Sequence, residues 1–535
     1  MTGAVTWAKL QPKPFQTRQA FVSALCLSAV AYSFLLIPTV MTHLQAASSL
    51  VDVSRLMDLP WSEILSLSKK WKWLIDLGLV LVGGLTTWLY WRLLLTASQP
   101  NSDLQLKTIL LWTGLFALIL AGVIPFHSRD VFGYINRGAE QVVYGVNPYL
   151  VPVEGIKTWH EDLLFHEHWI HNPCPYGFFF AQATAWMVTL GGKVFWGAFL
   201  VAKLMNVTLY IALTWLIAKV IRRLSENETQ AMTGALMFGW NPLMLMQLVG
   251  NGHNDLWVGF GLVLTFFLAI SERQQHWMWP VFILTALVKY TVLLLLPVLL
   301  VWTWLNRSHL KWGQAILLSL FTVGFSIWPY AMDLPHFPWD KILENATLSQ
   351  HSFHSALSRM MQYLGMGLLG WDMDLEQVRK WIKWLLCALV IGVLFVSIQK
   401  LIIFSKNNLR SSAEGDINEG LEVIHHTDPV QHSSFQNTFA QNTLLWAMTA
   451  LMVSFLLVAS AKFHAWYIGS FFPLLCLFLK GHFFQRLGLW LSVFQLGAFT
   501  FLENVHILNA FLLNGVPLAL AYFDSQNRIR FKMSL

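Results

Sequence analysis

Apolar runs long enough to cross a bilayer recur along this 535-residue chain, and they constrain its fold more than any other feature. A transmembrane helix needs about 20 consecutive, mostly apolar residues. The chain is 56% hydrophobic and only 12% charged, whereas soluble proteins carry about 25% charged residues. Backbone polar groups in hydrocarbon must be bonded within the protein. The sequence therefore predicts an all-α polytopic membrane protein.

Charge, aromatic content and cysteine usage narrow the classes of function. The 27 Trp and 38 Phe are typical of aromatic belts at membrane interfaces. The net charge of +7 is modest and indicates cytoplasmic Lys and Arg rather than a surface for nucleic acid. The four cysteines are scattered and form no CxxC pair, so neither a disulfide framework nor a thiolate metal site is indicated. We expect contact with membrane lipid and none with nucleic acid.

The positions of Lys and Arg set the expected orientation, because basic residues concentrate in cytoplasmic loops. With the basic N-terminus and Arg222-Arg223 inside, about 13 transmembrane helices are expected, and residue 130 lies on the outer face. Two runs fit this count poorly. The run 177–190 is too short for a span, and the run 279–305 carries Lys289 in its middle. Either is expected to be a pair of half-helices or a tilted element near a cavity.

The chain is predicted to divide at changes in polarity. Its parts are a cytoplasmic N-terminus (1–19), an N-terminal transmembrane module (20–404) with outer loops at 126–176 and 333–380, a flexible cytoplasmic linker (405–442), C-terminal transmembrane helices (443–525) and a cytoplasmic tail (526–535). The first outer loop is expected to hold short amphipathic helices. The linker is assigned because it is polar, rich in Ser, Asn and His, and lacks apolar periodicity.

The first outer loop opens with the densest group of polar and aromatic residues. Asp130, Tyr134 and Arg137 fall at i, i+4 and i+7, on one face of a short helix that Gly145 ends. Ionised groups cost about 3 kcal/mol or more each in hydrocarbon, so this helix belongs at the surface or in a wet cavity. Asp130 can be the helix N-cap. It can also be a base, kept ionised by Arg129 or Arg137, that accepts a proton from a hydroxyl.

A cluster of acids and histidines follows in the same loop. Its members are Glu161, Asp162, His166, His168 and His171. The His-x-His-x-x-His spacing suggests a metal site, but it matches no metal-binding helix pattern. We favour a second acidic contribution to a substrate site, and we expect neither a metal ion nor a cofactor.

The segment Gly-Asn-Gly-His-Asn-Asp at 250–255 interrupts an apolar pattern on the expected outer side. Asp255 can cap the helix that follows. Alternatively, His253, Asn254 and Asp255 form a hydrogen-bonding pocket for a hydroxyl-rich ligand. The sequence favours neither interpretation.

Two lysines in apolar surroundings are candidates for contact with a phosphate. Lys289 either extends to a membrane interface or meets the phosphate. Lys462 stands beside His464, Trp466 and Tyr467 on the expected outer face. A cation among aromatic groups suits a lipid-linked phosphate that bears a sugar.

Taken in order, these motifs resemble the C superfamily of glycosyltransferases, and among them bacterial polyprenol-phosphate-mannose-dependent mannosyltransferases. The resemblance covers about residues 20–525. It rests on Ser-Arg-Asp-Val-Phe-Gly-Tyr at 128–134, Gly-Val-Asn-Pro-Tyr at 145–149, Pro-Tyr-Gly at 175–177, Asn-Pro at 241–242, Gly-His-Asn-Asp at 252–255, Val-Lys at 288–289 and Trp-Tyr at 466–467.

The resemblance implies an inverting, metal-independent enzyme of the bacterial plasma membrane. It would move a hexose, with mannose favoured, from a polyprenyl-phosphate donor to a cell-envelope glycan or glycolipid on the outer face. Asp130 takes the position of the base. Substrate contacts are expected from Arg129, Tyr134, Arg137, Asn147, Tyr149, Glu161, Asp162, Tyr176, His253, Asn254, Asp255, Lys289, Lys462, His464, Trp466 and Tyr467.

Two other classes of protein compete with an enzyme. A transporter or flippase of lipid-linked sugars should show repeated halves with broken helices and polar residues near mid-membrane. Here the polar residues concentrate in outer loops instead. A non-catalytic scaffold would not need Asp130, Tyr134 and Arg137 aligned. The sequence therefore favours an enzyme.

Overall fold

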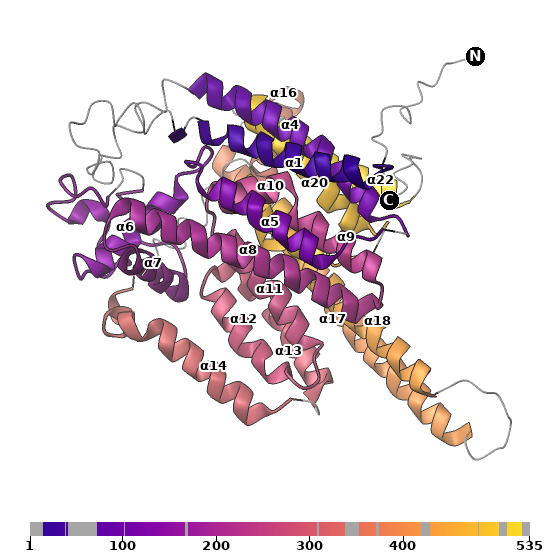
Figure 1. Cartoon of the computed structure of the whole chain (residues 1–535). Helices are drawn as coiled ribbons and strands as arrows, with labels where there is room; N and C mark the ends of the chain where they lie inside the picture. Colours follow the sequence, from indigo (N-terminus) through magenta and orange to yellow (C-terminus); the bar gives the residue numbers. More distant parts are fainter. Residues whose placement is uncertain are drawn as a thin grey trace.

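The computed structural model of the chain is helical, and its described residues contain no β-strand. They are 14–37, 39–40, 72–100, 102–165, 169–307, 310–337, 352–370, 374–418, 429–479, 481–501 and 511–526. The prediction of an all-α fold is confirmed for these residues. Figure 1 shows most helices gathered in one bundle, with α6 and α7 together at one end of α8.

The helices follow one another with short connections. The first half of the chain contains α1 (Arg18–Phe34), α4 (Lys72–Ala97), α5 (Leu106–Ala121), α6 (Asp130–Val142), η3 (Val153–Gly155), α7 (Phe178–Leu190), α8 (Phe195–Ser225), α9 (Glu228–Gly239), α10 (Pro242–Met244), η4 (Leu245–Gly250) and α11 (Asp255–Ala269). The second half contains η5 (Gln275–Trp277), α12 (Met278–Ala286), η6 (Tyr290–Leu295), α13 (Leu296–Leu305), α14 (Trp312–Ile327), η8 (Trp328–His336), α16 (Phe353–Leu369), α17 (Leu375–Asn418), α18 (Pro429–Val453), η9 (Ser454–Ala459), η10 (Ala465–Tyr467), α19 (Ile468–Leu475), α20 (Phe483–Phe501), η11 (Phe511–Gly515) and α22 (Val516–Ser525).

Several of these helices are long and apolar enough to cross a membrane. Five are found among the described residues: Asp76–Ala97, Phe195–Ser225, Trp312–His336, Leu375–Ile403 and Phe439–Ala459. Shorter apolar helices, such as Leu106–Ala121 and Phe178–Leu190, accompany them. The chain is thus a membrane protein, and the expected number of about 13 spans stays a prediction.

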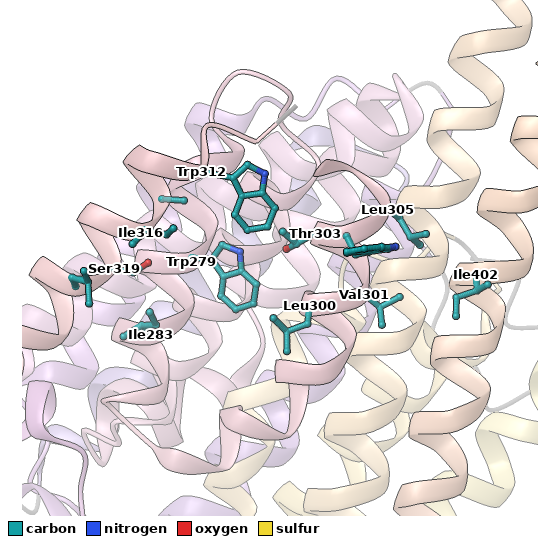
Figure 2. Close-up of a pocket in the computed structure, with 13 residues that line it drawn as sticks. Trp279, Ile283, Leu300, Val301, Thr303, Leu305, Trp312, Ile316, Ser319 and Ile402 are labelled. Carbon is teal, nitrogen blue, oxygen red and sulfur yellow. The ribbon is translucent and has the colours of Figure 1, made fainter. Parts of the chain in front are cut away.

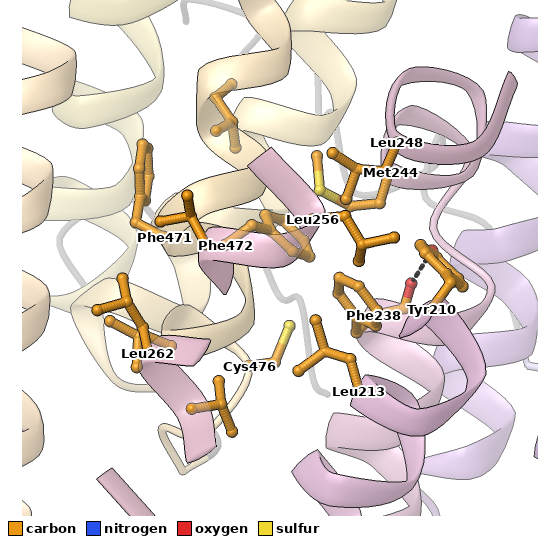
Figure 3. Close-up of a cluster of buried hydrophobic side chains, with 14 of the residues drawn as sticks. Tyr210, Leu213, Phe238, Met244, Leu248, Leu256, Leu262, Phe471, Phe472 and Cys476 are labelled. Atoms are coloured by element: carbon orange, nitrogen blue, oxygen red, sulfur yellow. Dashed lines mark hydrogen bonds between the residues drawn. The ribbon is translucent and has the colours of Figure 1, made fainter. Parts of the chain in front are cut away.

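The centre of the bundle is packed by side chains from α8, α9, α11 and α19 (Figure 3). Leu213, Phe238, Leu256 and Phe472 are fully buried there. The hydroxyl of Tyr210 donates to the Phe238 carbonyl at 2.7 Å, which satisfies a polar group that lipid or apolar side chains could not. This core fixes α8 and α11 relative to each other, and both helices position the candidate site.

The run 279–305 is broken where the lysine in its middle predicted a break. α12 ends at Ala286, Lys289 has extended backbone, and η6 and α13 continue the run. The short run at 177–190 forms the 13-residue helix α7. A Cβ at Gly138 of α6 would overlap the carbonyl of Thr184 in α7, so glycine allows these two helices to touch.

The polar segment 405–442, predicted to be a flexible linker, is helical on both sides of residues 419–428, which lie outside the described residues. α17 continues to Asn418 and α18 begins at Pro429, and the two helices project as a pair in Figure 1. Extending an existing helix requires no new nucleation, so polar residues can prolong a long apolar helix.

The first outer loop was expected to hold amphipathic helices, and α6 starts at Asp130 as its spacing predicted. Gly145, with φ of +62°, lies where the chain leaves α6. However, every side chain from Val131 to Glu140 is buried. α6 is therefore covered on all sides by α7, α8 and the loop that follows it, rather than lying with one face in water.

Candidate active site

The carboxylate of Asp130 lies against a buried histidine. Its Oδ2 is 3.5 Å from Nδ1 of His253, whose side chain is fully buried while that of Asp130 is 20% exposed. Burial alone would raise the pKa of Asp130, but interactions with His253, Ser128 and His464 outweigh it and hold the pKa below its usual range. Arg129, not Asp130, is the N-cap residue of α6. Asp130 is thus an ionised carboxylate that does not cap the helix.

A stack of three rings, those of His253, Trp466 and His464, links the turn at His253 to a segment more than 200 residues later in the chain. The rings of His253 and Trp466 are parallel at 4.2 Å, and those of His464 and Trp466 are parallel at 4.3 Å. Within the described part of the chain, Nε2 of His253 has no hydrogen-bond partner although it is buried. The stack therefore brings the motifs at 252–255 and 464–467 to Asp130.

Tyr134 connects α6 to the same turn. Its hydroxyl accepts a hydrogen bond from the backbone N–H of Asn254 at 3.3 Å. The Tyr134 ring stands edge-on to Tyr176 and Phe180, with ring centres 5.2 and 4.9 Å away. Two of the aromatic residues predicted for the site, Tyr134 and Tyr176, are thus in contact with each other beside Asn254.

A second carboxylate in the site is neutralised within the protein. Both oxygens of Asp255 accept hydrogen bonds from Nζ of Lys289, at 2.9 and 3.0 Å, and Ser470 donates to one of them at 2.5 Å. Nζ of Lys289 also lies 4.4 Å from the centre of the Tyr467 ring. Asp255 begins α11 without capping it. Because its partner is Lys289, that lysine is not a free cation.

Lys462 is a cation near Asp130 that is not paired with a carboxylate among the described residues. Its Nζ lies 5.2 Å from the Trp169 ring, and none of the described carboxylates forms an ion pair with it. Burial lowers the pKa of Lys462, the charge of Asp130 raises it and that of Lys289 lowers it, for a net decrease. An anion bound beside Lys462 would meet an ammonium group that is already partly desolvated.

Two backbone segments are tied together beneath the site. Oδ1 of Asn251 accepts hydrogen bonds from the backbone N–H groups of Phe126 and His127, at 3.0 and 3.2 Å. Gly252 has φ of +78°, which favours glycine, and a Cβ there would lie 3.3 Å from Val131. These contacts place the turn before His253 directly on the loop that leads to Asp130.

The guanidinium of Arg137 is bonded to groups of the protein, so its role is structural. Its guanidinium pairs with Glu140 at 2.6 Å and donates to the carbonyls of Trp169 and Asn172, at 3.0 and 2.5 Å. Arg137 and Glu140 are buried. This arrangement fixes the loop whose Trp169 ring lies under Lys462.

Asn147 and Tyr149 also make bonds within the protein. The Asn147 side chain donates to Asp333 at 2.8 Å and accepts from the backbone of Tyr149 at 3.0 Å. The Tyr149 hydroxyl donates to the Tyr176 carbonyl at 2.8 Å, and its ring is buried against Phe178. The Gly-x-Asn-Pro-Tyr turn therefore anchors the loop after α6 to η8.

The described members of the acidic and histidine cluster do not converge on one point. The Tyr144 hydroxyl donates to Asp162 at 2.7 Å, His171 lies 2.5 Å from Glu154 at the surface, and Glu161 is exposed. His166 and His168 lie outside the described residues. Within the described ranges, no three His, Cys, Asp or Glu side chains gather as metal ligands would.

One apolar cavity is separate from these residues. A cavity of about 860 Å³ lies between α12, α13, α14 and α17, and its lining includes Trp279, Leu300, Trp304, Trp312 and Ile402 (Figure 2). Its lining contains none of the predicted site residues. It lies at the start of α14, whereas the other end of α14 contacts α7 through Gln182.

Two residues of α8 that sequence analysis missed reach the segments under the site. Nζ of Lys203 donates to the Val123 carbonyl at 3.2 Å and the Val249 carbonyl at 3.0 Å. Nδ2 of Asn206 donates to the Leu248 carbonyl at 2.8 Å. The available signal was a pair of polar residues three positions apart in a mostly apolar run, and it names no partner.

Comparison with known proteins assigns the chain to a family. The family described as "Alpha-(1->6)-mannopyranosyltransferase, N-terminal domain" matches residues 36–306, just over half of the chain. The chain belongs to this family. The resemblance drawn from the sequence motifs is thereby confirmed at the level of the mannosyltransferase family. The matched range contains Asp130, His253, Asp255 and Lys289, and the segment 462–467 lies beyond it.

One curated relative illustrates the family. Alpha-(1->6)-mannopyranosyltransferase A of Mycobacterium tuberculosis (strain ATCC 25618 / H37Rv) is 26% identical over 268 residues, which cover 42% of this chain and 50% of that protein. The match therefore spans half of the relative's length. No solved structure matches the chain.

Proposed function

We propose that this protein is a membrane mannosyltransferase that uses a polyprenyl-phosphate mannose and glycosylates a hydroxyl of a cell-envelope glycan or glycolipid. The observation that carries the proposal is the ionised Asp130 carboxylate, held 3.5 Å from buried His253 at the start of α6. Both residues lie within the part of the chain that matches the mannosyltransferase family. A base at this place is what transfer to a hydroxyl requires.

The proposed transfer proceeds in one displacement. The acceptor hydroxyl gives its proton to Asp130 while its oxygen forms a bond to the anomeric carbon of mannose. The bond from that carbon to the phosphate oxygen breaks, and the polyprenyl phosphate leaves with the electron pair. Attack opposite the leaving group inverts the anomeric centre. An α-linked product, as the family description names, then requires a β-linked donor.

Lys462 is the residue we propose for the departing phosphate. It has no carboxylate partner among the described residues, whereas Lys289 is neutralised by Asp255. Its ammonium is partly desolvated beside Trp169, which strengthens its attraction for an anion. Arg129, half-buried directly before Asp130, is the second candidate cation. His464, which stacks on Trp466 with one ring face, would offer its other face to the sugar.

The polyprenyl chain would lie along α14. Trp312, Ile316 and Leu320 follow at intervals of four residues and lie on one side of α14, and Gly324 and Trp328 continue this row as it winds around the helix axis. The first three line the cavity of about 860 Å³. The last two line a second cavity of about 470 Å³, which also contacts Gln141 of α6. The two cavities thus follow this winding row of α14 toward the end of the bundle that holds α6.

The function is tested with purified protein in lipid nanodiscs and a short α-(1→6)-linked mannoside as acceptor. Radiolabelled mannose is supplied as polyprenyl-phosphate mannose or as nucleoside diphosphate mannose. We expect transfer only from the lipid donor, at the same rate with excess EDTA, because a lysine can offset the charge of one phosphate. Transfer from the nucleotide donor, or movement of the intact lipid-linked sugar across a bilayer without transfer, contradicts the proposal.

The orientation of the membrane domain gives a separate prediction. In a variant without the four native cysteines, single cysteines replace Lys157 in the first outer loop and Glu272 in the turn after α11; both positions are exposed. An impermeant maleimide added to intact cells should label position 157 and not position 272 until the membrane is opened, because Arg273 favours the cytoplasm. Equal labelling of both positions in intact cells would exclude the proposed outer-face site.

A further inference from the structure

A fully buried lysine in the middle of α8 contacts backbone instead of a counter-charge. Nζ of Lys203 donates to three carbonyls, those of Val123, Val249 and Gly250. It also lies 5.2 Å from the centre of the Phe199 ring. Among the described residues no carboxylate forms an ion pair with it. A buried ammonium is costly unless it is fully bonded, so this site is built around the three carbonyls.

The three carbonyls belong to the two segments that carry the proposed base and its histidine. Val123 lies in the loop that runs from α5 to Asp130. Val249 and Gly250 end η4, four and three residues before His253. A cation at the C-terminal end of a helix is favoured by the helix dipole. Lys203 therefore bonds to both segments at the point where they approach each other.

Asn206 lies three residues later in α8, on the same helix face as Lys203. Its Nδ2 donates to the carbonyls of Leu248 and His253, at 2.8 and 3.4 Å, and its Oδ1 accepts from the Trp257 indole at 2.9 Å. Both ends of the turn that presents His253 are thus held by side chains of α8. Asn251 adds a third tie to the Asp130 loop from within the turn.

We propose that Lys203 is a positioning residue that clamps the Asp130 loop to the His253 turn and so sets the geometry of the proposed base. The catalytic part of this inference rests on the proposed function, but the clamp itself does not. The Asp130 carboxylate lies 3.5 Å from His253, so its direction depends on how closely the two segments meet. A displacement of about 1 Å in a reacting group can lower a rate by about 10²-fold.

The test compares Lys203→Met, which keeps the length of the side chain and removes its donors, with Lys219→Met as the matched control. Lys219 is also in α8 but lies over the rings of Trp215 and Phe267. Hydrogen–deuterium exchange is measured on peptides covering 122–131 and 245–256. Steady-state transfer from polyprenyl-phosphate mannose is measured in parallel.

We expect Lys203→Met to speed exchange about tenfold in those two peptides alone, because the bonds lost join only these segments. kcat should fall by about 10²-fold with the KM for the donor unchanged. Lys219→Met should change neither. With His253→Asn already present, Lys203→Met should cause little further loss of kcat, because the two substitutions remove the same arrangement.

Other results overturn the inference. Unchanged exchange in the two peptides shows that Lys203 is not a clamp, and faster exchange throughout the protein shows only a general role in folding. Faster exchange in the two peptides with a normal kcat would show that Lys203 is a clamp that has no effect on the proposed base. If the wild-type protein transfers no sugar, the proposed function fails while the exchange data still decide the clamp. If Lys203→Met does not accumulate, Lys203→Gln, whose shorter side chain cannot reach all three carbonyls, is measured on the same two peptides, with the same expected pattern.

Discussion

Asp130→Asn is expected to lower kcat for mannosyl transfer by about 10²–10⁴-fold, the range for loss of a general base. The amide of Asn has nearly the shape of the carboxylate but cannot take a proton from the acceptor hydroxyl. Protein yield and the midpoint of thermal unfolding should stay near those of the wild type. Asp130 does not cap α6, since Arg129 is the N-cap residue and makes no side-chain capping bond.

The matched control for this substitution is Glu154→Gln. Glu154 is an acid of the loop that follows α6, lies at the surface and pairs with His171 through its side chain. Its neutralisation should leave transfer within about twofold, because exposed ion pairs contribute little. Normal turnover in Asp130→Asn would show that the carboxylate has no part in the reaction, whatever the activity of the control.

The pH dependence of transfer reports on the same carboxylate. Because the pKa of Asp130 lies below its usual range, the base stays ionised at neutral pH and is lost only when the pH falls toward that pKa. His253→Phe removes the interaction that lowers the pKa of Asp130. Burial of the carboxylate then raises that pKa. The acid limb of the kcat/KM profile should then move to higher pH in this variant.

Local features of the fold could be predicted from the sequence because they depend on nearby residues. The start of α6 at Asp130 and the left-handed Gly145 after its end follow from helix spacing and the conformational freedom of glycine. The break at Lys289 follows from a charge in an apolar run. The helical class itself follows from composition.

Pairings between distant segments could not be predicted in this way. Asp255 and Lys289 were each expected to bind substrate, and no pattern indicates that they neutralise each other across 34 residues. Lys203 contacts carbonyls 46, 47 and 80 residues away, and a backbone carbonyl leaves no trace in a sequence. The stack of His253 on Trp466 is a contact of the same kind.

Arg137 shows how a correct helical spacing can leave the role of a residue open. The i, i+4, i+7 pattern placed it with Asp130 and Tyr134, and the structure places Tyr134 beside Asn254. Arg137 instead faces Glu140, three residues later in the same helix. That i, i+3 pair was visible in the sequence, but burial decides whether such a pair is a weak surface contact or a structural one.

Arg137→Met is therefore expected to destabilise the protein strongly, by about 3–5 kcal/mol, because it leaves the buried carboxylate of Glu140 without its partner. The double variant Arg137→Met, Glu140→Gln removes both charges and should recover part of this loss. A remainder of about 1–3 kcal/mol is expected, since the carbonyls of Trp169 and Asn172 lose their donor.

The measurement is the midpoint of thermal unfolding in detergent for the wild type, both single variants and the double variant. The midpoint should be lowest for Arg137→Met and higher in the double variant, which is the signature of a buried ion pair rather than two independent residues. Transfer assayed at low temperature should retain its KM for the lipid donor wherever the protein is folded. A normal midpoint with a tenfold higher KM would instead mean that Arg137 binds the donor, as the sequence predicted.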